Sequence, residues 1–391
     1  MTDYKILIAQ AAALHEHTVR HRRHLHAHPE LSFGEHETAR YIAAALDTLG
    51  IPHVPIAGTG VLARIEGRGD LRRAVVLRAD TDALPIGEQT GLAYGSQNAG
   101  VMHACGHDMH AAALLGALAL LNSRRDEIEG TVLGLFQPGE ECCPGGASLV
   151  LAEHPFDAFD IRAFVGQHVD PDLAVGTFGL RAGVYTASSD ELHITVRGVG
   201  GHAAMPSRLR DPVVAAAQIV TALQQVVSRN ADGNIPTVLS IGRLIADGAT
   251  NIIPDEVTMQ GTLRTFDADW RAGAKERIRA IASGVASAYG TEAIVTIRDG
   301  YPSVVNDPVL TRRTADILGA LAGTDRVLAL DRRMTAEDFG YYTAHYPSVF
   351  YRLGVGRPGE EPQRLHTPGF APDERALDHG AAALAALALS L

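Results

Sequence analysis

The first half of the chain alternates short apolar runs with longer amphipathic segments. The short runs are bounded by glycine, proline or charge, which is typical of buried strands. They lie at residues 60–65, 74–77, 130–136 and 161–165. The longer segments, at 35–49 and 110–121, carry apolar residues at helical spacing, and Gly50 with Pro52 ends the first of these helices. Because the strands are apolar on both faces and alternate with helices, we expect an α/β fold with a mostly parallel sheet covered on both sides.

From about Gly183 the pattern changes to alternating polar and apolar positions, as in antiparallel strands with one solvated face. The predicted order is strand, helix, strand, strand, helix, strand, and Asp211 followed by Pro212 marks the start of the first helix. The segments are a strand to about 197, then 211–227, 237–244, 256–265, 269–289 and 293–298. This βαββαβ order is ferredoxin-like. We therefore expect an inserted ferredoxin-like α+β domain at 184–301 and a discontinuous α/β domain formed by 1–183 and 302–391.

Length and charge narrow the class of protein. A chain of 391 residues is longer than one hydrophobic core usually supports, which agrees with two domains. The formal net charge of -11 argues against a nucleic-acid partner, because phosphate recognition needs clustered Lys and Arg. No apolar run reaches the roughly 18 residues of a membrane span, and the N-terminus lacks the basic start of a signal peptide. We expect a cytoplasmic protein without a membrane partner.

The cysteines and the crowded histidines need separate interpretation. Cys105, Cys142 and Cys143 are too few for a disulfide framework in a chain of this length, so cysteine here is structural, metal-binding or catalytic. Four histidines crowd one segment, namely His21, His24, His26 and His28. Their spacing matches no four-ligand zinc pattern, and we interpret them as a solvated helix end and turn.

Acids, histidines and a cysteine follow several predicted strands of the first domain. They are Asp80, Asp82, Glu140, Glu141, His168 and the loop 103–110. Ligands of open α/β sheets bind beyond the carboxyl ends of the strands, so these groups are expected to converge. Cys105 and His107 can reach one ion because Gly106 between them allows a tight backbone. Neighbouring acids are usually only solvated, but here one carboxylate could bind metal while the other moves protons.

Eight ordered motifs carry a resemblance to a known family. They are His26 with 29–33, 78–85, 102–110, Gln-Pro-Gly-Glu-Glu at 137–141, Gly-Gly-His-Ala-Ala-Met-Pro at 200–206, Asn-Ile-Ile-Pro at 251–254, 337–339 and Leu-His-Thr-Pro at 365–368. In this order the chain resembles the M20 metallopeptidases from about residue 22 to 370. The branch it resembles is the aminoacylase-like one, which contains hippurate hydrolases, N-acyl amino acid amidohydrolases and auxin-conjugate hydrolases.

The resemblance implies a site and a reaction. Its metal ligands would be Cys105, His107, Glu141, His168 and His366, holding two divalent ions per subunit (Zn, Mn, Co or Ni). Glu140 would be the general acid/base, and Asp82 would act beside the site with Asp80 in support. A thiolate has several lone pairs, so Cys105 is the candidate for bridging the two ions. The implied reaction is hydrolysis of the amide bond of N-acyl amino acids or small peptides.

The resemblance also assigns residues of the inserted domain. His202, Asn251 and Arg264 would bind the carboxylate of the substrate and polarise its scissile carbonyl, with the histidine supplied by a partner subunit. Arginine suits this task because its planar fork bonds both carboxylate oxygens. We therefore expect a homodimer formed through the inserted domain, which would also act as a lid.

Two departures and two alternatives stand beside this interpretation. Cys142 and Cys143 occupy positions that are usually glycine in the family, and residues 334–336 differ from the commoner Gly-Ser. One alternative makes Cys105 a nucleophile with His107 or His103 as its base, but it leaves the other three ligand candidates unexplained. The second alternative is a metal-binding regulatory protein without activity, which would have no use for Glu140.

Overall fold

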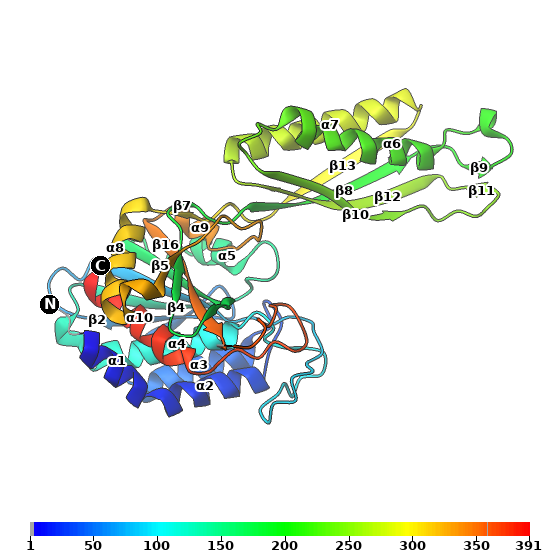
Figure 1. Cartoon of the computed structure of the whole chain (residues 1–391). Coiled ribbons are helices and arrows are strands. Elements are labelled where there is room, and N and C mark those ends of the chain that lie inside the picture. The colour runs from blue at the N-terminus through cyan, green and yellow to red at the C-terminus, as the bar shows by residue number, and fades with distance from the viewer. Residues whose placement is uncertain (1–3, 358) are drawn as a thin grey trace. The chain divides into compact units, whose positions relative to one another are not determined.

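The structure is a computed structural model that describes residues 4–357 and 359–391. The chain forms two compact units. Unit 1 consists of Met1–Tyr185, Val304–Asp331 and Asp338–Leu391, and unit 2 of Thr186–Ser303 and Arg332–Glu337. Figure 1 shows the helices and strands of both units.

Unit 1 is built on one eight-stranded sheet. Its order is β1 (His53–Ile56), β2 (Gly60–Glu66), β4 (Thr131–Gln137), β3 (Arg73–Asp80), β5 (Asp160–Ala174), β16 (Ser348–Gly356), β6 (Phe178–Leu180) and β15 (Val327–Ala329). The four central strands β4, β3, β5 and β16 are parallel, whereas β1 and β2 pair antiparallel at one edge. Parallel central strands put their carboxyl ends at one edge of the sheet, and open α/β sheets bind their ligands beyond that edge.

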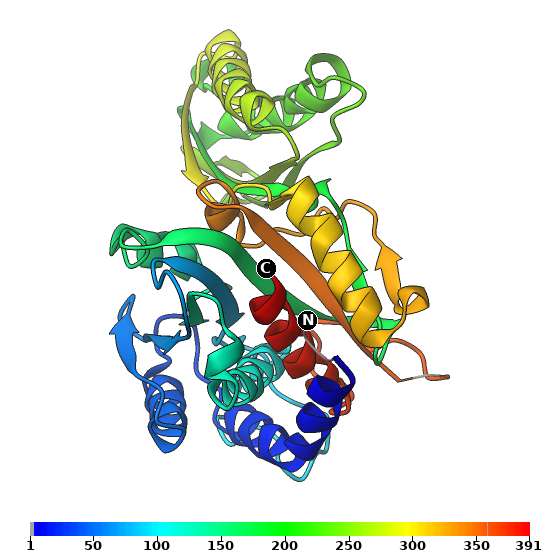
Figure 2. The same ribbon diagram turned by 90° about the vertical axis from the view of Figure 1, so that its left-hand side faces the viewer.

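Helices cover both faces of this sheet, as its apolar strands require. The helices of unit 1 are α1 (Tyr4–Ala13), α2 (His15–Ala27), α3 (His36–Thr48), α4 (His107–Asn122), α5 (Gly146–Ala152), α8 (Pro308–Ala322), α9 (Gly340–Thr343) and α10 (Ala376–Ser390), with short turns η1 (Arg125–Glu127) and η4 (Thr324–Arg326). Val75 and Leu77 of β3 pack into the core that contains α1, α4 and α10, whereas Val76 faces the core of α5 and α9. Figure 2 shows α1, α2, α4 and α10 together beside the strands. The predicted α/β fold class is confirmed.

The bounds of two of these elements differ from those that the sequence pattern predicts. The predicted helix at 110–121 begins earlier, at His107, and the predicted strand at 161–165 extends to Ala174. The apolar pattern predicted that His168 follows this strand, but in the structure His168 lies inside β5. Gly166 pairs with Arg78, so His168 is level with the end of β3.

Unit 2 is an antiparallel four-stranded sheet with two helices. The sheet order is β10 (Thr237–Ile245), β12 (Glu256–Thr265), β8 (Ser188–Arg197) and β13 (Glu292–Asp299). Helices α6 (Pro212–Gln225) and α7 (Ala268–Ala288) pack on one sheet face around Leu192, Ile219 and Ile278. Asp211 caps α6 by accepting the backbone N–H groups of Val213 and Val214, as its sequence predicted. The element order and sheet order are ferredoxin-like, in agreement with the expected α+β insertion.

Smaller elements complete both units. They are β7 (Gly183–Val184) paired with β14 (Val305–Asn306), β9 (Gly201–His202) paired with β11 (Ile252–Ile253), η2 (Pro206–Arg208) and the π-helical turn η3 (Val226–Asn230). Among the residues that the structure describes, no helix is long and apolar enough to cross a membrane.

Candidate metal centre

Five potential metal ligands meet at the carboxyl edge of the unit 1 sheet. His168 comes from β5, Glu141 follows β4, and Cys105 with His107 lies at the start of α4. Cys105 Sγ is 3.5 Å from Nε2 of His168 and 3.2 Å from Nε2 of His366. His366 Nε2 is also 3.3 Å from Glu141 Oε1. The three residues that had to converge for the predicted site, Cys105, His168 and His366, are therefore together.

The ligand atoms form two groups that share one sulfur. In each group, the donor atoms lie within 4.8 Å of one another; the groups are Cys105 with His107 and His168, and Cys105 with Glu141 and His366. Cys105 belongs to both groups, and at 7% exposed its side chain is largely shielded from bulk water. This arrangement is the one that a bridging thiolate would need.

The histidine tautomers are set by backbone carbonyls. Nδ1 of His107 donates to the carbonyl oxygen of Asp82 at 2.8 Å, and Nδ1 of His168 donates to that of Val169 at 2.8 Å. Each ring therefore keeps the lone pair of Nε2 for the site. Nε2 of His107 is buried and has no hydrogen-bond partner among the described residues. A buried ring nitrogen without a partner is costly, and a bound cation would satisfy it. The donor set thus fits a bound metal.

Asp82 supports two of the candidate ligands. Its Oδ2 accepts hydrogen bonds from Ser32 Oγ at 2.7 Å and from the Glu141 N–H at 2.9 Å, and Oδ1 lies 3.2 Å from His107 Nδ1. Burial alone would raise the pKa of Asp82, but the bonds from His107, Ser32 and the Glu141 amide outweigh burial and lower it. Asp82 therefore stays ionised and positions His107 and Glu141.

Asp80 and His110 lie one layer deeper. His110 Nδ1 donates to Asp80 Oδ1 at 2.5 Å, and its Nε2 accepts the backbone N–H of Val169 at 2.9 Å. Both ring nitrogens are thus occupied, although His110 lies close enough to Asp80 and His107 to resemble a ligand group. Arg78 holds Asp80 with a 2.6 Å bond from Nη1. His110 therefore has no ring lone pair left for an ion, whereas Asp80 Oδ2 lies 3.8 Å from His107 Nε2.

When no cation is bound, the surroundings of His366, His107 and Cys105 favour the protonated forms of these three side chains. Hydrogen bonds to Cys105 and Glu141 raise the pKa of His366 to about 10. Burial would lower the pKa of His107, but the charge of Asp80 and contacts with Cys105 raise it well above its ordinary value. Burial, followed by the charge of Glu141, raises the pKa of the Cys105 thiol. A metal ion would displace these protons, which is the behaviour of ligand sets built for cations.

Glu140 is held beside the ligands by a constrained turn. It is 6% exposed, and its carboxylate oxygen lies within 4.8 Å of donor atoms of His107 and Glu141. The preceding Gly139 has φ of 61° and donates its N–H to Glu35 Oε1 at 2.8 Å. A Cβ at Gly139 would approach the ring of Phe33 to 2.2 Å, so only glycine fits there.

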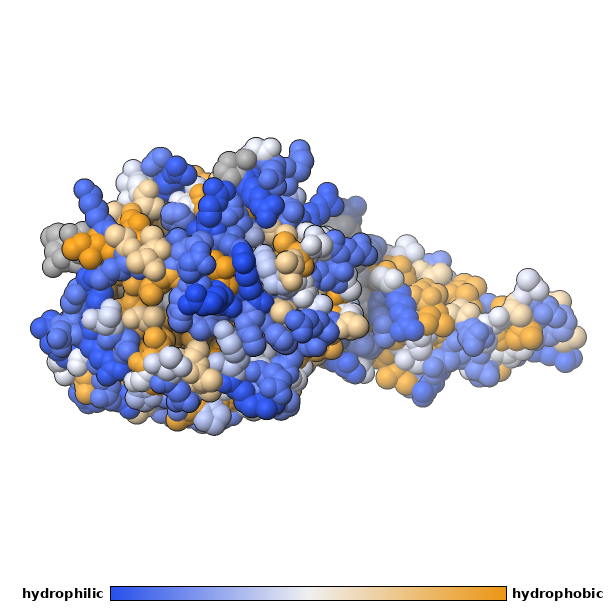
Figure 3. All heavy atoms as spheres, turned by 90° about the horizontal axis from the view of Figure 1, so that it is seen from below, coloured by the Kyte–Doolittle hydropathy of each residue, from blue (hydrophilic) through white to orange (hydrophobic). Residues whose placement is uncertain are grey.

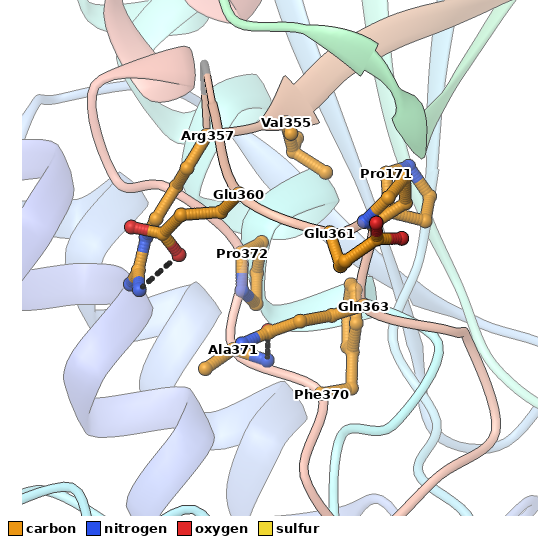
Figure 4. Close-up of a pocket in the computed structure, with 11 residues that line it drawn as sticks. Pro171, Val355, Arg357, Glu360, Glu361, Gln363, Phe370, Ala371 and Pro372 are labelled. Atoms are coloured by element: carbon orange, nitrogen blue, oxygen red, sulfur yellow. Dashed lines mark hydrogen bonds and ion pairs between the residues drawn. The ribbon is translucent and has the colours of Figure 1, made fainter.

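Two hydrogen bonds hold the loop that carries His366. Gln363 Oε1 accepts the Ala371 N–H at 2.6 Å, and Figure 4 shows these two side by side in the loop. His366 itself has φ of 59° and donates its N–H to Ala104 O at 2.9 Å. A non-glycine residue in this region is strained, and such residues concentrate at functional sites.

Cys142 and Cys143, by contrast, do not pack. Both are exposed and neither forms a disulfide. The Cys142 carbonyl accepts the Gly145 N–H at 2.9 Å and closes the turn after Glu141.

Two buried ionic networks escaped the sequence interpretation. Arg78 also bonds Gln137 Oε1 at 3.0 Å and Asp338 Oδ1 at 2.8 Å, which ties β3 to β4 and to the segment before α9. Arg22 bonds Asp108 Oδ2 at 2.8 Å beside His107. A charged residue inside an apolar strand, as at Arg78, was the available signal for the first network.

The three predicted substrate-binding residues lie in unit 2. His202 on β9 and Asn251 before β11 are both exposed, and the Asn251 carbonyl accepts the Ala203 N–H at 3.0 Å. The pairing of β9 with β11 thus brings these two together. Arg264 is half-buried on β12, opposite Ser189 and Val238 of the neighbouring strands.

A parallel α/β sheet with these donors at its carboxyl edge and an inserted α+β unit is typical of metal-dependent peptidases. Residues 76–390 match the model of the family described as Peptidase family M20/M25/M40. The chain belongs to this family, and the recognition made from the motifs is confirmed.

Similar proteins agree with this assignment. N-acetyl-L-cysteine deacetylase of Bacillus subtilis is 40% identical over 91% of this chain and 83% of its own length. N-acetyldiaminopimelate deacetylase of Geobacillus thermodenitrificans is 38% identical over 93% of this chain and 94% of its own. A crystal structure from Bacillus subtilis, described as a dinuclear metal-binding peptidase of the M20 family, has a TM-score of 0.83 and 36% identity, covering 97% of this chain and 98% of that one.

Proposed function

We propose that this protein is a metal-dependent amidohydrolase that cleaves the amide bond of N-acyl amino acids or small peptides. An enzyme that hydrolyses amides is what its family and its named relatives indicate. The observation that carries the proposal is the pair of donor groups sharing Cys105, with the buried Glu140 beside them. Two divalent ions, drawn from Zn, Mn, Co or Ni, suit this mixed set of thiolate, imidazole and carboxylate.

Glu140 is the group that moves protons in this proposal. Bound ions would supply Lewis-acid activation of the attacking water and of the scissile carbonyl. Glu140 accepts a proton as the water oxygen bonds to the carbonyl carbon, and returns it to the amine nitrogen as the carbon–nitrogen bond breaks. Asp82 and the backbone carbonyls keep the ligands oriented while this happens.

The proposed substrates are N-acyl amino acids with a short acyl group. Two relatives are named as deacetylases of N-acetylated amino acids, which supports an acetyl group ahead of a benzoyl group. We assign recognition of the free carboxylate and of the scissile carbonyl to His202, Asn251 and Arg264. Exposure of His202 on a separate unit supports its contribution to the site of a partner subunit.

Dimerisation, the lid role of residues 184–301 and a cytoplasmic location belong to the same proposal. Unit 2 exposes large apolar side chains on its edge strand β10, namely Val238, Leu244 and Ile245. In the view of Figure 3, apolar side chains, drawn in orange, lie on the visible face of unit 2. An exposed apolar edge strand is a place where a second chain can pair.

A cysteine nucleophile is a weaker explanation of the same residues. Burial raises the pKa of the Cys105 thiol, whereas nucleophilic cysteines have lowered pKa values. A chelator separates the two mechanisms, because EDTA would abolish metal-dependent hydrolysis and spare a cysteine hydrolase.

The test of the proposal is Glu140→Gln, with Glu141→Gln beside it. Glu140→Gln should retain metal and lose at least about 100-fold in kcat, since general acid–base catalysis contributes roughly 10²–10⁴-fold. Glu141→Gln should lose metal as well as turnover. Metal content and hydrolysis of N-acetyl amino acids are measured on both. Turnover near the wild-type rate in metal-loaded Glu140→Gln would refute the role of Glu140.

A further inference from the structure

Helix α2 places two histidine rings edge to face outside the proposed centre. His17 and His21 are four residues apart, so their side chains lie on one side of the helix. Their Nε2 atoms are 3.0 Å apart, and the ring centroids are separated by 4.4 Å. Two histidines at this helical spacing can bind one metal ion, as they do in zinc proteases with the same i, i+4 pair.

The distance between the two nitrogens indicates which ions fit. An ion about 2.0–2.1 Å from both nitrogens, when they are 3.0 Å apart, subtends an angle of about 90–97°. A tetrahedral angle of about 109° would need a separation of about 3.3–3.4 Å. The observed separation therefore suits the right-angled positions of tetragonal Cu²⁺ or Ni²⁺ better than tetrahedral Zn²⁺.

The surroundings of His21 resemble those of a metal-binding imidazole. His21 Nδ1 lies 2.8 Å from the hydroxyl of Tyr41 on α3. With Nδ1–H donating to that oxygen, Nε2 carries the lone pair, and such a second hydrogen bond orients metal-binding histidines. His21 is 8% exposed, and His17 is half-buried, so the pair opens to solvent on the side of His17.

Charge around the pair permits a cation at neutral pH. Burial lowers the pKa of both rings, that of His21 to about 4, so both are neutral. Without an ion the two Nε2 atoms share a hydrogen bond, and binding requires the His17 proton to move to Nδ1, which frees its Nε2 lone pair. On the exposed side, Arg20 Nη2 donates to His17 Nδ1 at 3.2 Å, and among the described residues it is the cation that contacts the pair. As an exposed, flexible side chain it can turn toward water when an ion binds.

The other histidines of this segment are occupied differently. His24 stacks on Tyr41 with ring centroids 3.8 Å apart, and His28 Nδ1 bonds the carbonyl oxygen of His24 at 2.8 Å. His26 bonds Asp108 and Glu88. The interpretation of the crowded histidines as a solvated end and turn is therefore too simple, because His21 and His26 are buried.

We propose that His17 and His21 form a third metal site, a two-imidazole chelate for Cu²⁺ or Ni²⁺ completed by water. The ion ties two turns of α2 together. The same helix carries Arg22 and His26, which both bond Asp108 next to His107. Occupancy therefore stabilises the helix behind the catalytic centre without adding a ligand to it.

The experiment is a Cu²⁺ titration of the full-length holoenzyme, with the metals already in the centre measured before and after. We expect one additional Cu²⁺ per chain, with nitrogen hyperfine structure from two imidazoles in its electron paramagnetic resonance spectrum. His17→Gln and His21→Gln should each weaken this binding at least tenfold. The matched control is His28→Gln, at the residue that follows the last turn of this helix, and it should bind Cu²⁺ as the wild type does.

Zn²⁺ and thermal stability give two further readouts. Zn²⁺ should compete with Cu²⁺ only weakly, and Cu²⁺ should raise the Tm of the wild type but not of His17→Gln. His17 is half-exposed, so this variant keeps its fold, which circular dichroism verifies. Undiminished Cu²⁺ binding in both His17→Gln and His21→Gln, or its loss in His28→Gln alone, would overturn the proposal.

Discussion

Cys105 is the residue on which the proposed centre depends most. Its sulfur contacts His168 and His366 at 3.5 and 3.2 Å and belongs to both donor groups. Cys105→Ser replaces a thiolate by a hydroxyl that stays protonated, so both ions should bind at least about tenfold more weakly. Metal per chain after dialysis measures this effect. Cys142→Ser, at an exposed thiol, is the control and should keep the wild-type content. Equal metal retention in the two variants would remove the bridging role.

Arg22 is fully buried against two carboxylates. Burial alone would raise the pKa of Asp108, but the charge of Arg22 and the bond from His26 hold it well below its ordinary value. The pKa of Glu374 is also lowered, because bonds from Arg23 and Arg22 outweigh burial. Carboxylates with lowered pKa values stabilise the fold above their unfolded pKa values, about 4, and lose that contribution as the pH falls through the folded values.

Arg22→Met should therefore destabilise unit 1 by about 3–5 kcal/mol at pH 7, because it leaves Asp108 buried without its cation. The difference from the wild type should shrink as the pH falls below about 4. The free energy of unfolding of both proteins is measured by urea unfolding at pH 7 and below about pH 4, followed by far-UV circular dichroism. Fluorescence is unsuitable because the single tryptophan, Trp270, lies in unit 2. A difference independent of pH would contradict the ionic role of Arg22.

At the residue level the sequence predicted the ligand candidates, with Asp82 and Asp80 beside them, but it did not predict the contacts that hold the surrounding segments in place. Cys105, His107 and Glu141 occur in short motifs whose chemistry can be read directly. Glu35 was missed because its bond to Gly139 joins residues 104 positions apart, and Arg78 meets Asp338 across 260 positions. Contacts of that kind depend on the assembled sheet, which no local pattern contains.

At the level of elements, the turn between β4 and α5 controls where Glu140 lies. Gly139→Ala would strain a positive φ and push a methyl group against Phe33. We expect at least about tenfold lower kcat/KM, since small misplacements of reacting groups are costly. Gly91 also has positive φ, 69°, but an added Cβ there would meet nothing within 4 Å. Gly91→Ala is the matched control and should keep its activity, and a similar loss in both variants would show that strain alone matters.

Helix and strand positions followed from the sequence where the apolar pattern was regular. Strands β2, β3 and β4 were predicted within a few residues, because they are apolar and bounded by turn formers. The length of β5 was not, since its second half contains His168, Asp170 and Pro171, which look like a loop. Pairing with β16 continues the strand through these polar residues. Because β16 is far away in the sequence, the local pattern around β5 contains no sign of this pairing.

At the scale of the whole molecule, the account requires two chains. The homodimer would form through unit 2, and β10 is the better edge because it exposes Val238, Leu244 and Ile245. Leu244→Lys with Ile245→Lys should give monomers in sedimentation equilibrium and reduce kcat/KM at least tenfold, since His202 would be lost from the partner's site. Ile294→Lys on the opposite edge strand β13 is the control and should stay dimeric. A fully active monomer would contradict a role for His202 between subunits.

The central claim is that five side chains hold two ions on either side of one sulfur. Anomalous diffraction from crystals of the metal-loaded protein, recorded at the absorption edge of the bound element, tests this directly. We predict two peaks within bonding distance of Cys105 Sγ, one next to His107 or His168 and the other next to Glu141 and His366. A single peak, or two peaks of which only one contacts Cys105, would contradict it.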